Sequence, residues 1–323
     1  MALVEDTQTL DEVVVVGYGT QKKVNLTGAV EQVTSEVFDN RSVPNVTQAL
    51  QGSIPNLNIQ LTDGKPTRSA SYNVRGTTSI GQGGSALVLI DGVEGDPSML
   101  NPNDIASVSV LKDAASAAIY GSKAANGVIL VTTKRGSDGK INVTYSGKFS
   151  YQTPAKLIRQ VTDYADYMEF VNEGYLNTNQ AAKFSQSTIN EWREAANNPN
   201  ATNVAGIPNY VTHPNTDWYD SLYRNALITG HNLSIRGGSE KLSSFLSLNY
   251  LSQEGILMNS KAERFGIRAN VEYKVNSWLR VGARLNYTRR NSQEPFDLFR
   301  VFEQQQGAAP FIAPYTGMAV SVQ

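Results

Sequence analysis

The second half of the chain alternates apolar and polar side chains with a period of two residues, the pattern of β-strands whose two faces differ. Each such segment runs about 9–12 residues, the length that a tilted strand needs to cross a bilayer, whereas soluble strands average about 5–6 residues. The alternation predicts an antiparallel sheet, either with one wet face as in a soluble sandwich or with one face toward lipid. Five segments carry the pattern: 141–151, 227–237, 242–252, 264–275 and 278–288.

Two further observations favour the membrane. Aromatic side chains lie near the segment ends, as in the interfacial girdles of outer-membrane barrels. Short connections at 237–239 and 276–277 alternate with long ones at 153–226 and 253–263. Barrels of this kind have short periplasmic turns and long external loops, so we expect the residues before 139 to be periplasmic or inside the barrel. The aromatic residues are Tyr145, Phe149, Tyr151, Tyr250, Phe265, Tyr273 and Tyr287.

The long connection 153–226 is expected to carry helices of its own at 163–171 and 188–196. Three aromatic residues near its end, Trp218, Tyr219 and Tyr223, are candidate contacts for a sugar or a partner protein. The alternative is that they hold the loop on the barrel rim. For any single one of them, this structural role is favoured over a binding role. Loops of this length are usually functional or disordered.

Composition excludes several classes of protein. The 323 residues have a formal net charge of −1 and no block of Lys and Arg, which argues against a nucleic-acid binder. The absence of cysteine excludes disulfide frameworks, thiol nucleophiles and cysteine-ligated zinc. No apolar run approaches the ~18 residues of a helical membrane span.

Residues 21–138 predict a compact α+β unit punctuated by Gly, Asn, Asp and Pro. Strands are expected at 29–34, 57–61, 72–75, 87–90, 107–111 and 128–133, with short helices at 45–50 and at 114–120, the latter capped by Asp113 and closed by Gly121.

The sequence shows no motif for catalysis, a cofactor or a metal. The glycine-rich stretch 76–84 lacks a phosphate-loop pattern, no nucleophile elbow is present, and His213 and His231 lie in separate segments without zinc spacing. Asp91, Glu94 and Asp96 were weighed as a calcium site, but their spacing fits no EF-hand and a solvated turn is the better interpretation. We therefore expect no enzyme, no cofactor and no metal.

The N-terminal region contains a short strand of high β-propensity, four consecutive valines preceded by two acidic residues and followed by glycine. Such a strand is suited to pair with the sheet edge of another protein, or equally to join the sheet of its own domain. Its residues are Asp11, Glu12, Val13, Val14, Val15, Val16, Gly17 and Tyr18.

These segments together resemble the SusC/RagA family of TonB-linked outer-membrane transporters. The N-terminal strand is similar to the family's TonB box, and the stretches 73–76, 87–93, 101–105, 110–121 and 124–134 are similar to its plug signature. The barrel segments around 216–218, 237–241, 253–256 and 275–282 resemble its first strands. The signature residues are Arg75, Gly76, Asp91, Gly92, Asn101, Pro102, Asp104, Lys112, Asp113, Tyr120, Gly121, Asn126 and Gly127.

The resemblance implies an α+β plug domain followed by antiparallel transmembrane β-barrel strands in the bacterial outer membrane. Residues 1–20 would hold the TonB box, 21–138 the plug, and 139–323 the first strands of the barrel. The family's barrel belongs to the ~22-stranded class, so about five strands cannot close it and we expect a fragment of a larger transporter. No signal peptide or N-terminal extension domain precedes Met1, which departs from the family's usual pattern.

The implied partners are TonB with ExbB and ExbD, a SusD-like surface lipoprotein, outer-membrane lipid, and an oligosaccharide or, less often, a peptide as cargo. The main alternative is a cell-surface protein that binds glycan or protein without transport. A soluble enzyme is a third class, for which the sequence offers no motif.

Overall fold

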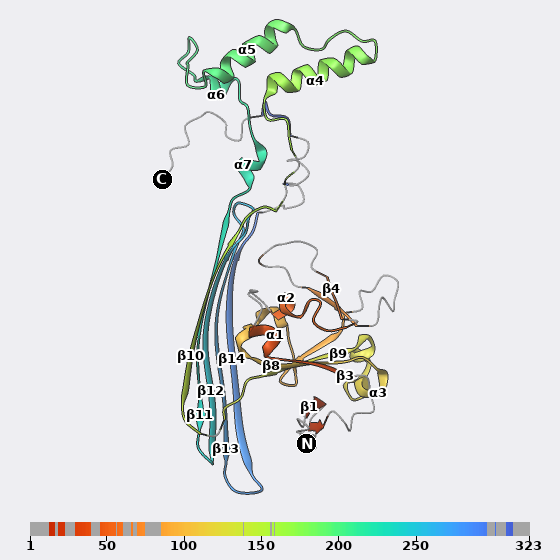
Figure 1. Ribbon diagram of the computed structural model, residues 1–323, viewed down its shortest axis with the longest axis vertical. Helices are drawn as coiled ribbons and strands as arrows, with labels where there is room; N and C mark the ends of the chain where they lie inside the picture. The colour runs from red at the N-terminus through yellow and green to blue at the C-terminus, as the bar shows by residue number, and fades with distance from the viewer. Residues whose placement is uncertain are drawn as a thin grey trace, which may run out of the picture. The chain divides into compact units, whose positions relative to one another are not determined.

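In a computed structural model, the described residues are 13–16, 19–22, 30–39, 46–55, 57–60, 66, 70–74, 85–137, 139–155, 157, 159–295, 301 and 308–312. They fall into two compact units. The first takes in the described residues of Met1–Tyr151, Leu227–Gly255 and Lys261–Gln293, and the second those of Gln152–Ala226, Ile256–Ser260 and Glu294–Gln323. Each unit is described separately (Figure 1).

The N-terminal half of the first unit contains a five-stranded mixed sheet in the order β3-β8-β9-β6-β7. Strand β9 is parallel to β6, and the other neighbours are antiparallel. Two short strands, β4 (Asn58–Gln60) and β5 (Ser71–Asn73), form a separate pair. The strands of the mixed sheet are β3 (Val30–Thr34), β6 (Leu87–Ile90), β7 (Val93–Glu94), β8 (Ile105–Leu111) and β9 (Val128–Thr133).

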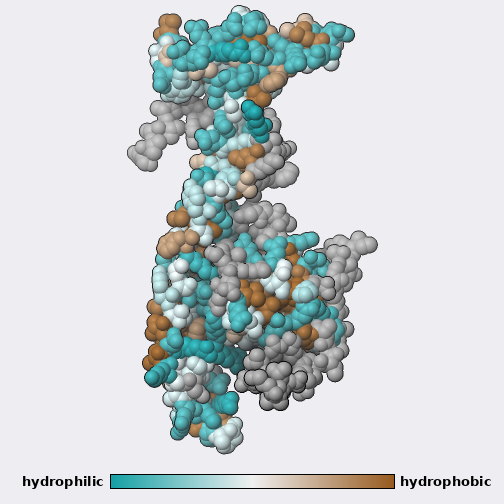
Figure 2. All heavy atoms as spheres, in the orientation of Figure 1, coloured by the Kyte–Doolittle hydropathy of each residue, from teal (hydrophilic) through white to brown (hydrophobic). Residues whose placement is uncertain are grey.

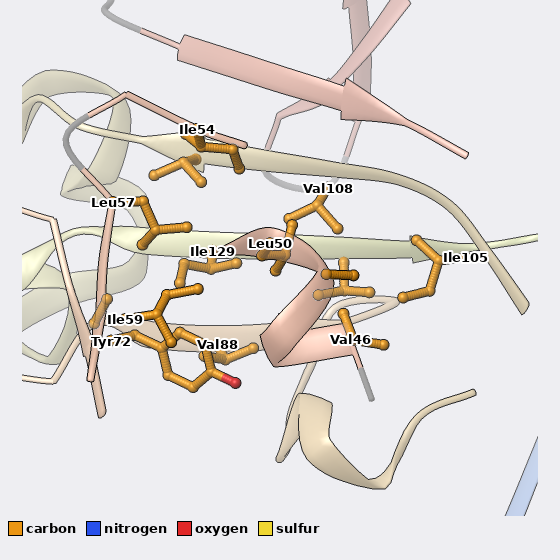
Figure 3. Packing of buried hydrophobic residues seen from close by; sticks show 14 of the residues in the cluster. Val46, Leu50, Ile54, Leu57, Ile59, Tyr72, Val88, Ile105, Val108 and Ile129 are labelled. Carbon is orange, nitrogen blue, oxygen red and sulfur yellow. The ribbon is translucent and has the colours of Figure 1, made fainter. Parts of the chain in front are cut away.

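Both faces of the mixed sheet are covered by apolar side chains. On one face Ile129 packs with Leu50, Val108 and Ile105, beneath the helices α1 (Glu36–Asp39) and α2 (Val46–Leu50) (Figure 3). The other face of β9 packs in a second cluster that includes Leu111 and Ala117. Because β9 is buried on both sides, its sequence is a continuous apolar run rather than an alternating one.

The helical segment after β8 differs from the single helix predicted at 114–120. Asp113 does cap it, since its Oδ1 accepts from the Ser116 N–H at 2.7 Å. However, α3 (Ala114–Ala117) ends after four residues and continues as a 3-10 segment, η4 (Ala118–Asn126). Gly121 breaks this segment with φ 71° and ψ −156°, a conformation that is strained for residues with a Cβ. Two further 3-10 turns, η2 (Pro97–Met99) and η3 (Pro102–Asp104), precede β8.

Five long strands, β10 to β14, form an antiparallel meander in which sequence neighbours pair (Figure 1). All five predicted strands are confirmed. The last two pair from Lys261↔Gln293 to Lys274↔Arg280, so they extend beyond the alternating pattern, because backbone pairing does not require apolar side chains. The strands are β10 (Asn142–Gln152), β11 (Ala226–Gly238), β12 (Leu242–Glu254), β13 (Lys261–Lys274) and β14 (Arg280–Gln293).

The two faces of the meander are reversed relative to a soluble sheet. On β13 the polar residues Arg264, Arg268 and Asn270 are buried, whereas Phe265 and Tyr273 on the opposite face are 42% and 45% exposed. Figure 2 shows hydrophobic side chains at the outer left edge of the meander. Exposed apolar side chains on one face and buried polar ones on the other are expected for a sheet with lipid on its outer side.

The strand register orders the exposed face into rows that cross the meander. One row joins His231, Tyr250, Phe265 and Arg289. The rows that follow are largely apolar, the first joining Leu233, Leu248, Ile267 and Tyr287 and the last Leu242, Tyr273 and Val281. The polar and aromatic row therefore lies at one rim of an apolar band, where interfacial aromatic and basic residues are typical.

The second unit contains two antiparallel-packed helices, α4 (Tyr164–Asn177) and α5 (Gln186–Asn197), each longer than predicted. Asp163 caps α4 and Ser185 caps α5. Ala165, Met168 and Ile189 form their contact, flanked by partly buried aromatic residues. Two shorter helices follow, α6 (Asn209–Thr212) and α7 (Trp218–Leu222). Across the part of the chain that the structure describes, no helix has the length and apolarity needed to cross a membrane.

Candidate functional site

The candidate site is the contact between the mixed-sheet region and the buried face of the meander, here called the polar interface. The mixed-sheet side contributes the turn after β6, the η2 and η3 turns and the end of β9. The meander side contributes alternate residues of β11, β12 and β13. Its members are Asp91, Ser98, Asn101, Asp104, Thr133 and Lys134 on the first side, and Asn232, Ser247, Arg264, Arg268 and Asn270 on the second.

Arg268 lies at the centre of the polar interface, with its side chain only 4% exposed. Its Nη1 is 3.5 Å from Asp91 Oδ2, its Nε is 3.8 Å from Asp104 Oδ2, and its Nη2 donates to Asn286 Oδ1 at 3.1 Å. One guanidinium of the meander therefore faces two carboxylates of the mixed-sheet region. Both ion-pair distances exceed those of a tight bidentate pair, so the attraction is weaker than it is at ideal geometry.

The backbone presets Asp91 for this contact. It occupies the left-handed region at φ 49° in the turn after β6. There its carboxylate accepts from the Thr133 N–H at 3.0 Å and from the Thr133 hydroxyl at 2.6 Å. These bonds anchor the side chain to β9, so Arg268 meets a carboxylate that is already held in place.

Hydrogen bonds extend the polar interface on both sides of Arg268. Asn101 Nδ2 donates to Asn232 Oδ1 at 2.6 Å, and Arg264 Nη1 donates to the Ser98 carbonyl at 2.7 Å. Asn270 Nδ2 donates to the Lys134 carbonyl at 2.8 Å. These contacts are directional and polar, and water can replace each of them when the two surfaces separate.

The polar interface is incompletely satisfied. Asp104 Oδ1, Arg268 Nε and Asn270 Oδ1 are buried and have no hydrogen-bond partner among the described residues. Burial raises the pKa of the Asp104 carboxyl, against a hydrogen bond from Ser247 and the charges of Arg268, Lys134 and Arg264. Burial prevails because the Arg268 contact is long. Each orphaned atom costs free energy while the surfaces are joined, which makes this contact easier to open than an apolar one.

The predicted signature residues divide between this interface and the fold of the mixed-sheet region. Asp91, Asn101 and Asp104 lie in the polar interface. Lys112, the residue that follows β8, pairs with Glu31 of β3, and Gly92 has φ 91° in the turn after Asp91. Gly127 has φ 97°, and a Cβ there would lie 2.9 Å from Val74 Cβ. The remaining residues shape turns or pack: Pro102 begins η3, Asp113 caps α3, Tyr120 packs on the second cluster, and Gly121 and Asn126 lie in η4.

Arg75 and Gly76 lie outside the described residues, as do Asp11, Glu12, Gly17 and Tyr18. The valine strand is seen as β1 (Val13–Val16), paired with β2 (Gly19–Lys22) from Val13↔Lys22 to Val16↔Gly19. This hairpin is a separate two-stranded sheet and has not joined the mixed sheet. Its role in binding TonB stays a prediction.

The aromatic residues of the long connection pack within the second unit. Trp218 Nε1 donates to the Ala309 carbonyl at 3.4 Å, and the Tyr219 and Tyr223 rings lie 5.8 Å apart. Tyr223 also forms an isolated bridge with Leu257. Each residue therefore has a structural contact in its own unit, and a role in binding cargo stays a prediction.

The three carboxylates that were weighed as a calcium site have separate roles. Asp91 contacts Thr133 and Arg268, Glu94 pairs with Lys123 at 2.7 Å, and Asp96 caps η2 through the Ser98 N–H. For Asp91 the solvated-turn interpretation is wrong, since its side chain is only 10% exposed. Among the described residues no group of three or more potential ligands could hold a metal ion.

Sequence reasoning missed the meander half of the polar interface, namely Asn232, Ser247, Arg264, Arg268 and Asn270. The alternation placed them on the polar face of the strands without indicating what that face contacts. The signal in the sequence was the pair Arg264 and Arg268, four residues apart on the polar face of one strand. A repeated arginine on one face suggests an acidic or polar partner rather than water alone.

A lipid-faced meander whose inner face holds a mixed α/β body through polar groups defines an outer-membrane receptor with a plug. Comparison with known proteins agrees, since residues 22–128 match the family model described as TonB-dependent Receptor Plug Domain. TonB-dependent receptor P26 of Formosa agariphila is 37% identical over 296 residues, which cover 90% of this chain and 28% of that protein. TonB-dependent receptor SusC of Bacteroides thetaiotaomicron is 33% identical over 83% of this chain and 25% of its own length.

Among solved structures, the RagAB peptide importer in its open-open state aligns with a TM-score of 0.73 and 27% identity, over 88% of this chain and 33% of that one. The chain thus spans about a quarter to a third of the proteins it matches. It belongs to the TonB-dependent receptors of the SusC/RagA type, which reside in the outer membrane and are not enzymes.

Proposed function

We propose that this chain forms the plug and first wall strands of a transporter that imports a nutrient across the outer membrane with energy delivered by TonB. The observation that carries the proposal is the polar interface. A plug held by apolar packing would resist displacement, whereas one held by Arg268 and a few amide and hydroxyl contacts can leave the wall at lower cost. The mixed sheet keeps its own apolar core and can move as a body.

We infer that force enters through the valine strand. The TonB box, Asp11 to Tyr18, would add to a strand of TonB through its main chain, with ExbB and ExbD supplying the energy from the inner membrane. Chain order then carries the pull to β3, an edge strand of the mixed sheet that pairs only with β8. The ion pair between Lys112 and Glu31 joins these two strands. An edge strand has one ladder to break, so β3 is the element we expect to yield first.

The proposed surface partner is a SusD-like lipoprotein. Support comes from the SusC relative and from the RagAB structures. The helices of the second unit belong to the long connection on the proposed external side, and α4 exposes Phe170 at 62% and Leu176 at 58%. We propose these exposed side chains as part of the surface that meets the lipoprotein. The proposed cargo is an oligosaccharide or a peptide.

The proposed division of the chain is a tail with the TonB box at 1–20, a plug at 21–138 and wall strands from 139. The polar interface joins the last two parts, since Asp91 and Asn101 lie before the boundary and Arg268 lies after it.

Replacing Val14 by proline tests the energy coupling. Proline removes the main-chain N–H that strand addition needs, so uptake by cells that carry the full-length Val14→Pro transporter should fall to the level of cells without TonB. Val14→Ala keeps the N–H and should retain most of the uptake. Uptake that is unchanged in Val14→Pro, or that persists without TonB, would favour a surface binding protein that does not depend on TonB.

A further inference from the structure

A cleft of about 570 Å³ lies in the first unit, between the connection that follows β9 and the strands β13 and β14. Arg135, Arg280 and Arg284 line it, with Glu272 as the one acidic residue among the described residues of its lining. The cleft is near the short turn that joins β13 to β14, the end of the meander proposed to face the periplasm. None of its arginines belongs to the polar interface.

The strand register explains how the arginines converge. Arg284 pairs with Asn270, Gly282 with Glu272, and Arg280 with Lys274, at alternate positions on the face that holds Arg268. Gly282 has no side chain and leaves a gap between the two arginines of β14. The connection lies directly on β12 beside the cleft, since a Cβ on Gly136 would be 2.2 Å from Ser244 N. The close approach of Gly136 to β12 fixes the position of Arg135.

Among the described residues of the cleft, basic side chains outnumber acidic ones. Arg280 Nη1 lies 3.8 Å from Glu272 Oε1, and within the described part of the chain neither Arg135 nor Arg284 forms an ion pair. Arg268 on the same face differs, because two carboxylates of the mixed-sheet region face it. Three guanidinium groups around a concave surface with one carboxylate attract anions, and guanidinium groups bind carboxylate and sulfate with two parallel hydrogen bonds.

The face of the meander decides what kind of anion can reach the cleft. Arg280 and Arg284 lie on the face opposite to Ile267 and Tyr273, which belong to the apolar rows of the exposed face. A lipid headgroup would approach from those apolar rows, whereas a solute in the lumen would approach from the face that carries the arginines. The geometry therefore favours a solute that passes between the plug and the wall.

We propose that this cleft binds a carboxylate group on the imported solute as it passes the plug, so that the cargo class is acidic. The proposal rests on the proposed import function and deepens it. Arg280 and Arg284 supply the wall side of the site and Arg135 the side of the connection. Neutral solutes of the same size gain nothing from these groups.

Calorimetric titration of the purified full-length receptor tests the site without TonB. Three probes are compared: tetragalacturonate, tetra-aspartate and the neutral galactotetraose. We expect an acidic probe to bind and the neutral one not to bind, and Arg280→Gln and Arg284→Gln each to weaken binding by about tenfold. If only one acidic probe binds, that probe shows whether the carboxylate belongs to a sugar or to a peptide. Arg284→Lys should retain part of the affinity, because it keeps the charge but loses the bidentate geometry.

Arg236→Gln is the matched control, since Arg236 is an exposed arginine on β11 outside the cleft. It should leave the affinity unchanged. The proposal is overturned if neither acidic probe binds the wild-type receptor, or if the neutral probe binds as tightly as the acidic ones. It is also overturned if Arg280→Gln and Arg284→Gln bind the acidic probe as tightly as the wild type does. The titration does not involve TonB, so a negative binding result would not contradict the import proposal. Conversely, uptake that does not depend on TonB would contradict the import proposal but not the measured binding.

Discussion

The core of the mixed sheet and the polar interface bury side chains to a similar degree but join their partners by different forces. In the core, Leu50, Ile105 and Ile129 are fully buried among other aliphatic side chains. In the polar interface, Arg268 and Asp104 have side chains that are 4% and 3% exposed, yet one polar atom of each lacks a hydrogen-bond partner among the described residues. Burial alone therefore does not report how firmly two parts of a molecule are joined.

The two contacts differ in the free energy needed to expose their surfaces to water. Exposing aliphatic side chains costs about 25 cal/mol per Å², whereas exposed amides and charges regain hydrogen bonds to water. A body with an apolar core and a polar contact surface can therefore leave its neighbour without unfolding. Three experiments bear on this contrast.

The largest effect is expected from a covalent bond across the polar interface. Asn101 and Asn232 touch through their side-chain amides at 2.6 Å. In the full-length transporter, the double variant Asn101→Cys with Asn232→Cys should lose import when its two thiols are joined by a short bifunctional methanethiosulfonate reagent, and recover it on reduction, because the crosslink prevents separation. Each single cysteine variant is the control. Import at the wild-type rate by the crosslinked transporter would show that this contact does not open.

A cavity in the core should be the next largest effect. Ile105→Ala removes a fully buried side chain and should destabilise the mixed sheet by about 3 kcal/mol. Hydrogen exchange of amides in β8 and β9 should then accelerate by about a hundredfold, since each 1.4 kcal/mol is a factor of ten. Ile119, which is 57% exposed, gives the matched control Ile119→Ala, for which little change is expected. Equal effects of the two substitutions would remove the contrast between core and surface.

The smallest effect concerns pH at Asp104. Because burial raises its pKa above the ordinary value of 3.8, the joined state holds the proton more tightly than the separated state. Its contribution to stability is therefore fully present below pH 3.8 and is lost as the pH rises through the raised pKa. Asp104→Asn should remove this pH dependence, because an amide side chain does not titrate in this range. Urea unfolding midpoints between pH 4 and 7 measure it, and identical profiles for wild type and variant would contradict the assignment to Asp104.

The sequence alone predicted the strands of the meander well because their two faces lie in different environments, which imposes an alternating pattern. Every second residue of β13 meets lipid or the interior, so Phe265, Ile267 and Tyr273 had to alternate with polar residues. The prediction failed at strand ends, where Arg290 and Gln293 continue the ladder without apolar side chains. It also failed at 114–120, where Gly121 and a 3-10 segment replace a regular helix.

The site could be predicted only on one side. The resemblance indicated Asp91, Asn101 and Asp104 as members of a plug signature with a general structural or gating role, but named no partner for any of them. Their partners Arg268 and Asn232 are separated from them by more than a hundred residues of sequence. No local pattern reports such a distant pairing, and the left-handed turn that points Asp91 toward β9 is equally typical of a solvated loop.

The rows on the exposed face of the meander also fix a length. Eight residue steps separate Phe265, in the row with Arg289, from Tyr273, in the last apolar row. At ~3.3 Å per residue and a tilt of about 40°, the apolar band is about 20 Å thick along the membrane normal. Such a band suits a thin bilayer and would suffer hydrophobic mismatch in a thicker one, where Arg289 and His231 would be drawn into hydrocarbon. The spacing of these rows thus favours a membrane of matching thickness, whatever solute the receptor binds.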